Sequence, residues 1–598
     1  MDNKNLIPRR RVLGLGMALA GLCAGCAVLP GEDAESAAAS AAVGTETVEK
    51  APVTDINSVH LRDNQELYSV YDDSGVVTMY LTVSRGNDSE NTNHSWSEIN
   101  HYSVYDYEAM GVPRYQVAAL LQVGDENGPV AGEVGYADSV PNATVQIRGQ
   151  TSSQNAQKNY KIKLKKNKGS WRGQRTIALN KHQGEGLRFR NKMAYDLIRE
   201  IPQMMGLRTQ FVHLYVKDLT DSPSAAFEDY GLYTQVEQLN KTALKAHGAD
   251  PQGQLYKINR FEFYRQEDVI RLTSDPAYDQ ARFETLLEIK GNSDHSKLIH
   301  MLEELNDETN PMDEVLFQTH FDRENIAYWM AFQIITGNTD TQNRNVYLYS
   351  PQNSTRWYLW AWDNDGMLRR EERKIIKFSD SESWERGVSN YWGNVLFRRC
   401  LQTRSFRDAL NDAMDDLFGR MSPNHIADLV DHYRNLTEPY IWRMPDRMYL
   451  PLTYAEYEQV LESIWPEIDQ NYDHYWESYD YPMPFFLGLP EAANGQLWFR
   501  WDVSYDFDAQ DIYYTLEVAK DYQFAHLLLR QENILLPEFQ MEMLPAGQYF
   551  FRVRATNASG YTQDAFDYYV TEAGKHYGMR CFYIQPDGSI LEDTYEEQ

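Results

Sequence analysis

Two short acidic motifs, roughly twenty residues apart, are the part of this sequence best suited to chemistry. In the first motif Asp340 is followed five residues later by Asn345, and in the second Asp363 and Asp365 flank a single residue. The intervening residues 346–360 contain two short aromatic segments separated by a turn-rich run, which predicts a β-hairpin. Carboxylate and amide oxygens gathered in this way could hold a divalent cation and accept a proton.

The order and spacing of these residues are similar to the layout that protein kinases use. There, an Asp takes the proton of the acceptor hydroxyl, and an Asn and a second Asp hold Mg²⁺ on the nucleotide phosphates. The alternative interpretation is a polar turn followed by a strand whose end is acidic without a catalytic role.

Length and composition limit the possible classes of protein. A chain of 598 residues is too long for one hydrophobic core and predicts about two to four domains. Its 41 Tyr and 13 Trp supply enough apolar surface to argue against global disorder. The formal net charge of −30 argues against nucleic acid as a partner, because the phosphate backbone would be repelled, and it suits a soluble surface protein.

Residues 1–26 have the pattern of an export signal. Arg9–Arg11 precede an apolar run too short to span a bilayer, and they also resemble a twin-arginine signal. Small residues before Cys26 resemble the bacterial lipobox, which implies a lipidated cysteine at the mature N-terminus and a lipoprotein held at the cell membrane, outside the cytoplasm. A buried pair of Cys23 and Cys26 is the alternative. The Ala-, Ser-, Thr- and Glu-containing residues 27–58 are then predicted to be a flexible tether.

Beyond Cys26, the mature chain would retain two cysteines, Cys400 and Cys581, so a disulfide framework is not expected. Cys400 lies in a helical pattern, where a buried free thiol is the expected state.

One strongly basic segment stands out in this acidic chain. Residues 158–175 contain eight Lys or Arg and no Asp or Glu. The alternation at Lys161–Lys165 predicts a strand with its lysines on one face. Just upstream, Arg148 begins a small-residue turn whose backbone N–H groups could face phosphate oxygens. The surrounding negative charge favours an anion site, and a solvated lysine face is the alternative.

The elements that would position these motifs follow in a definite order. An amphipathic helix is predicted over 187–201, and strands over 211–216 and 230–236, the second ending at Glu237. A helical part carrying both acidic motifs comes next. This order matches the two lobes of a protein kinase.

Six segments in sequence resemble the CotH kinase family, atypical kinases named after a bacterial spore coat protein. They cover roughly residues 60–420 and are Ile147–Gly149 with Ser152–Ser153, Lys158–Tyr160, Leu187–Lys192, Gly231–Glu237, Asp340–Tyr349 and Trp362–Asp365. Two departures are Arg344, where the family often has His, and Ala361, where Pro usually precedes the Trp-Asp pair. Neither departure removes a metal ligand or the base.

The resemblance implies an α+β fold, with an atypical two-lobed protein kinase-like domain, that uses ATP with Mg²⁺ or Mn²⁺ and phosphorylates Ser or Thr of exported proteins. Asp340 would orient or deprotonate the attacking hydroxyl, and Asp363 and Asn345 would hold the metal. Asp365 would be an additional metal ligand or a neighbour of one. Hard oxygen ligands suit these cations.

The expected nucleotide contacts are less specific. Lys158 or Lys161 would neutralise the phosphates, with Arg148 helping. Glu237 would lie near the adenine at the linker between lobes, or it would form a structural salt bridge.

Helical patterning continues through Tyr472 and breaks at 481–484, so the kinase-like domain is predicted over 59–480, with a β-rich part at 59–140. Alternating segments then fill residues 488–598 and resemble a fibronectin type III module, a small all-β sandwich. Such a module could be a spacer that binds protein or glycan, or a purely structural cap.

The leading hypothesis is therefore an exported kinase, anchored to the membrane by lipid, that acts on surface or secreted proteins. The alternative is a catalytically inert surface module that binds carbohydrate or protein. A metal-dependent hydrolase using Asp340, Asp363 and Asp365 is a third possibility, made weaker by the absence of a His-Glu-x-x-His motif. Binding of ATP with a metal would separate the first hypothesis from the second.

Overall fold

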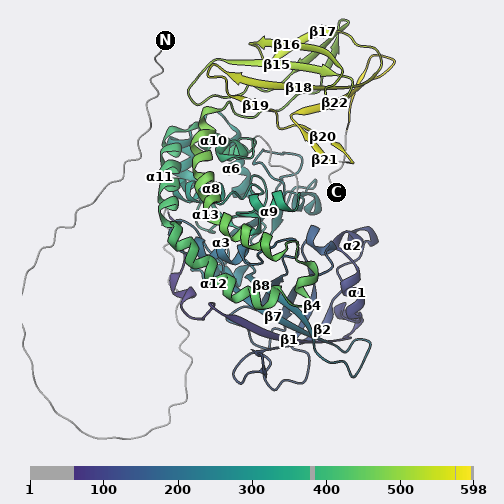
Figure 1. Ribbon diagram of the computed structural model, residues 1–598, viewed down its shortest axis with the longest axis vertical. Coiled ribbons are helices and arrows are strands. Elements are labelled where there is room, and N and C mark those ends of the chain that lie inside the picture. Colours follow the sequence, from purple (N-terminus) through teal and green to yellow (C-terminus); the bar gives the residue numbers. More distant parts are fainter. Residues whose placement is uncertain (1–59, 378–383, 573, 594–598) are drawn as a thin grey trace, which may run out of the picture. The chain divides into compact units, whose positions relative to one another are not determined.

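The computed structural model describes residues 60–377, 384–572 and 574–593, drawn in colour in Figure 1. The predicted signal with Cys26 and the predicted tether at 27–58 lie outside the described residues. Among the described helices, none combines the length and the apolar character needed to cross a membrane. The chain has a mixed α and β structure with an all-β region at its C-terminal end. A two-lobed arrangement stays a prediction.

A sheet that closes on itself carries the N-terminal part of the described chain. Its strands follow the order β1-β7-β8-β6-β5-β4-β2-β3, and β1 also pairs with β2, which completes the ring. The strands are β1 (Val76–Ser84), β2 (Val117–Asp125), β3 (Gly128–Pro129), β4 (Ala143–Arg148), β5 (Asn159–Leu164), β6 (Thr176–Asn180), β7 (Thr209–Asp218) and β8 (Glu228–Glu237). The predicted alternation in β5 is confirmed, because Tyr160, Ile162 and Leu164 are buried and Lys163 is exposed.

The part at 59–140 that the sequence predicts to be β-rich is not made of strands alone. It also contains two short helices, α1 (Trp96–His101) and α2 (Val104–Met110). A serine caps each helix, and its side chain accepts the backbone N–H of the third helical residue. The acidic side chain of that third residue in turn accepts the backbone N–H of the serine. These capping boxes are a local signal for helix starts.

The helix predicted over 187–201 is α3 (Arg190–Ile198), and every residue in it is buried. The amphipathic prediction was therefore wrong for its polar face, which does not meet solvent. Arg190 Nη1 lies 2.7 Å from Glu185, and Lys192 Nζ lies 3.1 Å from Asp196. Burial of these charges is tolerated because each has a partner of opposite sign.

The hairpin predicted between the acidic motifs is confirmed. Strands β11 (Val346–Ser350) and β12 (Tyr358–Ala361) pair antiparallel, with Val346 opposite Ala361. They join β9 (Gln254–Ile258) and β10 (Leu287–Ile289) in the order β10-β9-β11-β12. The aromatic side chains of the hairpin region are fully buried, so the hairpin is part of the core rather than a surface loop. They include Tyr347, Tyr349, Trp357 and Trp360.

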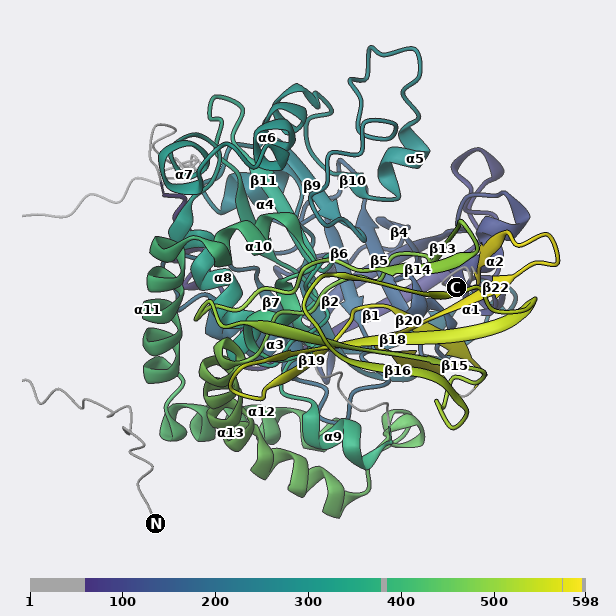
Figure 2. The same ribbon diagram turned by 90° about the horizontal axis from the view of Figure 1, so that it is seen from above.

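Helices surround this second sheet, and the helical patterning predicted through Tyr472 is confirmed by α10 to α13. α8 (Arg323–Ile335) packs against α11 and α13, which are drawn in green in Figures 1 and 2. The remaining helices are α4 (Lys241–Ala246), α5 (Gln280–Glu284), α6 (Ser296–Asn306), α7 (Phe317–Thr319), α9 (Arg370–Ile375), α10 (Val395–Gln402), α11 (Arg404–Arg420), α12 (Pro423–Ile441) and α13 (Tyr454–Glu477). Cys400 on α10 is a buried free thiol, as expected, and Cys581 is also buried and free.

Two sheets share one core in the C-terminal all-β region. One has the order β13-β14-β17, and the other has the order β16-β15-β18-β22-β23 with β19 beside β18. Leu497 and Phe499 of β14 join the same hydrophobic cluster as Leu516 of β15 and Phe551 of β18. The strands are β13 (Glu491–Ala493), β14 (Gln496–Arg500), β15 (Ile512–Ala519), β16 (Leu527–Ile534), β17 (Glu538–Glu542), β18 (Gly547–Asn557), β19 (Thr562–Asp564), β20 (Tyr568–Thr571), β21 (Gly574–Tyr577), β22 (Met579–Ile584) and β23 (Ile590–Glu592). The fibronectin type III assignment stays a prediction.

The C-terminal region packs against the helical part of the chain. Asn557 donates its amide N–H to the backbone oxygen of Asp480 at 2.9 Å. Trp392 contacts the rings of Tyr505 and Phe507, at centroid distances of 5.1 and 5.7 Å. These contacts bring the separate hairpin β20–β21 close to the loop that carries Asp340, where both contribute to one cleft.

Candidate active site

A cleft of about 650 Å³ gathers the residues of both acidic motifs. Asp340, Asn345, Asp363 and Asp365 all line it. Its volume lies within the range of small-molecule and cofactor sites, about 300–1,000 Å³. The structure therefore brings together the four residues that the sequence predicted as catalytic base and metal ligands.

The hairpin β11–β12 explains why the two motifs meet. Asn345 directly precedes β11, and only Trp362 separates the end of β12 from Asp363, so the antiparallel pairing returns the chain to the same edge. Both residues adopt left-handed backbone conformations, with φ of 57° and 56°. Such φ values are uncommon outside glycine and cluster at functional sites, where the surrounding structure holds them.

Asp340 is held from two sides. Asn345 donates its amide N–H to the Asp340 carboxylate and to the Asp340 backbone oxygen, both at 3.0 Å. Arg344 Nε lies 3.0 Å from the other carboxylate oxygen. The amide nitrogen of Asn345 is thus engaged, and its amide oxygen is the atom through which Asn345 would bind a cation. Arg344 occupies the position where the sequence departs from the family pattern, and here it pairs with the predicted base.

Two neighbouring carboxylates give the cleft its electrostatic character. Burial and the charge of Asp365 raise the pKa of Asp363 to about 6, although Lys257, His182 and Arg148 oppose this. Burial would also raise the pKa of Asp365, but the hydrogen bond from His182 and the positive charge of His182 lower this pKa instead. The His182 Nδ1–Asp365 Oδ2 distance is 3.2 Å. A divalent cation would relieve the repulsion between the two carboxylates, so the oxygen donors present fit Mg²⁺ or Mn²⁺.

A buried amide network fixes the turn that carries Asp365. Asn338 donates to Gln333 at 2.9 Å, and Gln333 donates to Asn364 at 3.2 Å. A Cβ at Gly366 would lie 2.7 Å from the Asn338 side-chain oxygen, closer than real Cβ contacts allow. The turn at 364–366 is therefore locked to the C-terminal end of α8, and a glycine is needed at its third residue.

The structure places the predicted phosphate-binding cations in different surroundings. Arg148 donates to the side chain of Asn180, and its charge acts on Asp363. Lys158 is buried and donates to the Ser153 backbone oxygen at 2.6 Å. Lys161 is half-buried on β5. Neither lysine lines the cleft of the acidic motifs.

Glu237 lies in a structural salt bridge, which is the alternative given for it from the sequence. It is buried, and its carboxylate lies 2.9 Å from His247 Nε2 and 3.1 Å from Arg208 Nε. His247 Nδ1 in turn lies 2.6 Å from Asp63. These four residues form a charged network inside the protein, and Glu237 does not line the cleft.

Three residues of the site were not predicted from the sequence. His182 bonds Asp365, Tyr195 accepts the backbone N–H of Asp363 at 3.3 Å, and the charge of Lys257 on β9 acts on Asp363. These residues lie more than 100 positions from their partners along the chain, and no spacing rule connects them. No local signal could have identified them.

The C-terminal region completes the lining of the cleft. Aromatic and cationic side chains from it face the same space as the acidic motifs, and they are Phe486, Phe566, Tyr568, Lys575 and Tyr577. Trp384 of the helical part lines the cleft too and contacts Phe566 and Tyr577, at centroid distances of 5.2 and 5.7 Å. Part of the wall around the predicted base is therefore aromatic.

Comparison with known proteins agrees with this geometry. A family model described as CotH kinase protein matches residues 145–475, more than half of the chain. The chain belongs to the CotH kinase family. The match contains both acidic motifs, the hairpin between them, and His182, Tyr195 and Lys257. None of the curated proteins compared with the chain matches it. CotH family membership indicates a kinase-like function.

The CotH match begins within β4, whereas the closed sheet begins at β1. β1 and β2 pair with each other and with β7 and β4, which lie inside or overlap the matched range. The structural unit that carries the CotH match therefore includes strands that precede it.

Proposed function

We propose that this CotH family member is an exported, lipid-anchored protein kinase that transfers the γ-phosphate of ATP to Ser or Thr hydroxyls of surface or secreted proteins. The observation that carries the proposal is the convergence of Asp340, Asn345, Asp363 and Asp365 on one cleft. Carboxylates, an amide and nearby cations are sufficient for phosphoryl transfer, because the reaction depends mainly on positioning and charge neutralisation.

In this reaction the acceptor oxygen forms a bond to the γ-phosphorus, and the bond from that phosphorus to the β–γ bridging oxygen breaks to release ADP. Asp340 orients the acceptor hydroxyl and takes its proton. Arg344 and Asn345 hold the Asp340 carboxylate in place. Asp363, Asp365 and Asn345 are the residues that would hold Mg²⁺ or Mn²⁺, which would neutralise the phosphates when bound. Arg148 and Lys257 lie near Asp363 and supply positive charge.

Lys158 or Lys161 stays our prediction for a phosphate contact, and the structure favours Arg148 and Lys257 for the region nearest Asp363.

We propose lipid anchoring through Cys26 on the lipobox resemblance alone. If Cys26 carries the lipid, Cys26→Ser should release the protein from membranes, whereas Cys23→Ser should leave it membrane-bound. A Cys26→Ser protein that stays in the membrane fraction and keeps its lipid label would remove this part of the proposal.

The test of the activity is incubation of the full chain with γ-labelled ATP, Mg²⁺ or Mn²⁺, and a mixture of exported proteins, followed by mass spectrometry of labelled acceptors. Transfer to Ser or Thr that requires metal is the expected result. If no nucleotide binds in the presence of metal, the catalytically inert surface module takes the place of the kinase.

A further inference from the structure

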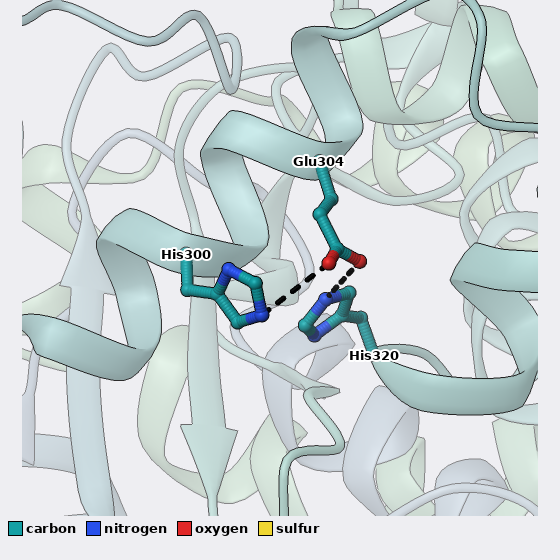
Figure 3. Close-up of side chains that lie close together, drawn as sticks. All are labelled: His300, Glu304 and His320. Atoms are coloured by element: carbon teal, nitrogen blue, oxygen red, sulfur yellow. Dashed lines mark hydrogen bonds and ion pairs between the residues drawn. The ribbon is translucent and has the colours of Figure 1, made fainter.

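A second group of metal-ligating side chains lies away from the cleft. His300 and Glu304 are one helical turn apart on α6, and His320 directly follows α7. Figure 3 shows the two imidazole rings directed at the carboxylate of Glu304. None of the three residues lines the cleft of the acidic motifs.

The distances are those of a ligand set rather than of a single ion pair. His300 Nε2 lies 3.3 Å from one Glu304 oxygen, and His320 Nε2 lies 2.8 Å from the other. All three ligand atoms fall within 4.8 Å of one another. Bond lengths of about 2.0–2.2 Å place the ligand atoms of a tetrahedral Zn²⁺ site about 3.4 Å apart. Small side-chain rotations would therefore allow all three atoms to bind one ion.

The core of the protein holds both elements that supply the ligands. The same helix α6 buries Leu298, Met301, Leu302 and Leu305, which leaves His300 and Glu304 on its outer face. The backbone oxygen of His320 accepts the N–H of Trp357 at 2.6 Å, just before β12 begins. The ligands are thus preorganised, and little conformational entropy remains to be lost on binding.

We infer that His300, Glu304 and His320 form a Zn²⁺ site that joins α6 to the segment leading into β12. Two imidazoles and one carboxylate select zinc or a similar transition metal over Mg²⁺, which prefers oxygen ligands. The side chains of His300, Glu304 and His320 are 61%, 28% and 2% exposed, so a fourth position is open to water or to a donor from a partner. The net charge of −30 favours cation binding at the surface.

The site is independent of the proposed kinase activity, and its test does not require turnover. Full-length protein is stripped of metal by chelator, dialysed against micromolar Zn²⁺ in millimolar Mg²⁺, and analysed for bound zinc and for melting temperature. Wild type should retain one zinc more per chain than His300→Ala, and zinc should raise its melting temperature. His300 is the residue to change because it is the most exposed of the three and its loss leaves the core intact.

Three further proteins complete the experiment. His300→Cys, which restores a zinc ligand, should recover at least part of the bound zinc, and His432→Ala, an exposed histidine on α12, should bind zinc like wild type. Asp365→Asn separates this site from any zinc held in the cleft, because it should keep the zinc that His300→Ala loses. If wild type and His300→Ala retain equal zinc and melt equally with it, the group is a hydrogen-bonded cluster and the inference is overturned.

Discussion

At the scale of single residues, the predicted base is the side chain with the most direct consequence. Asp340 contacts Asn345 and Arg344 but belongs to the acceptor side of the proposed reaction rather than to the nucleotide. Asp340→Asn keeps the size of the side chain and removes its ability to accept a proton. Phosphoryl transfer should fall by about 10²–10⁴-fold, the usual contribution of a positioned acid or base. The affinity for ATP, measured by calorimetry, should stay within a few-fold. Near-normal turnover by this variant would exclude Asp340 as the base.

Asp363 should instead control metal-dependent nucleotide binding. ATP with Mg²⁺ should stabilise the wild-type fold by about 2.7 kcal/mol at a hundredfold excess over Kd, which is visible as a melting shift. Asp363→Ala should lose most of this shift. The pKa of Asp363, raised to about 6 by burial and by Asp365, adds a pH test. Below that pH the cation must displace a proton, so its affinity should fall about tenfold for each pH unit.

The control for Asp363 must be a surface carboxylate, and the sequence suggested the wrong one. The charged residues around Glu372 on α9 predict an exposed side chain, but Glu372 is fully buried and accepts from Arg369 at 2.7 Å and from Arg190. Such charged neighbours are typical of a solvated helix, but the partner Arg190 comes from another element, α3. Glu462 on α13 is exposed, so Glu462→Gln should keep the melting shift. If wild type shows no shift with any nucleotide and metal, the kinase proposal loses its physical basis.

At the scale of elements, the buried network at the end of β8 sets how stability depends on pH. Burial would lower the pKa of His247, but Asp63 and Glu237 raise it to about 10. Burial would raise the pKa of Glu237, but His247 and Arg208 hold it at about 2. The stabilisation from His247 is complete below its unfolded pKa of about 6.5 and is lost as the pH rises through about 10. The stabilisation from Glu237 is present above about pH 4.3, its unfolded pKa, and is lost as the pH falls through about 2.

His247→Ala should therefore destabilise the protein most near pH 6, by about 3–5 kcal/mol, because it leaves two buried carboxylates without their cation. The difference from wild type should shrink at pH 9. Free energies of unfolding from denaturant titrations at both pH values would check this, with the exposed His432→Ala as a control. An equal difference at the two pH values would mean that His247 is not charged in the native protein.

At the scale of the whole molecule, the contact between the helical part and the C-terminal region gives the cleft a wall that the CotH match does not include. Tyr568, Lys575 and Tyr577 lie beyond residue 475 and line the same cleft as Asp340. An acceptor that reaches Asp340 would pass these side chains. Tyr577→Ala should therefore raise KM for a protein acceptor several-fold and leave KM for ATP unchanged.

The matched control is Tyr561→Ala. Tyr561 is also a partly exposed tyrosine of the C-terminal region, but its ring packs against that of Tyr481 and does not line the cleft. Steady-state kinetics with one acceptor at varied concentration would separate the two variants. Equal acceptor KM values for both variants would limit the C-terminal region to a structural role at this site.

The sequence by itself determined the local parts of the site. Asp340, Asn345, Asp363 and Asp365 lie within 26 residues, and the two aromatic segments with the turn-rich run between them predict a hairpin whose pairing brings them together. The strand of alternating lysines and the helices after residue 395 follow from the same kind of short-range pattern. Such features depend on neighbours in the chain, and periodicity reports them directly.

Tertiary structure alone decided which distant residues serve the site. His182, Tyr195 and Lys257 reach Asp363 and Asp365 through strand pairing and helix packing, which no local pattern encodes. The same reason explains the closed sheet, since β1 pairs with both β2 and β7. It also explains the burial of Glu372, because this charge is tolerated inside the protein where the opposite charge of Arg190 from another element meets it. Partners of this kind are set by the fold as a whole.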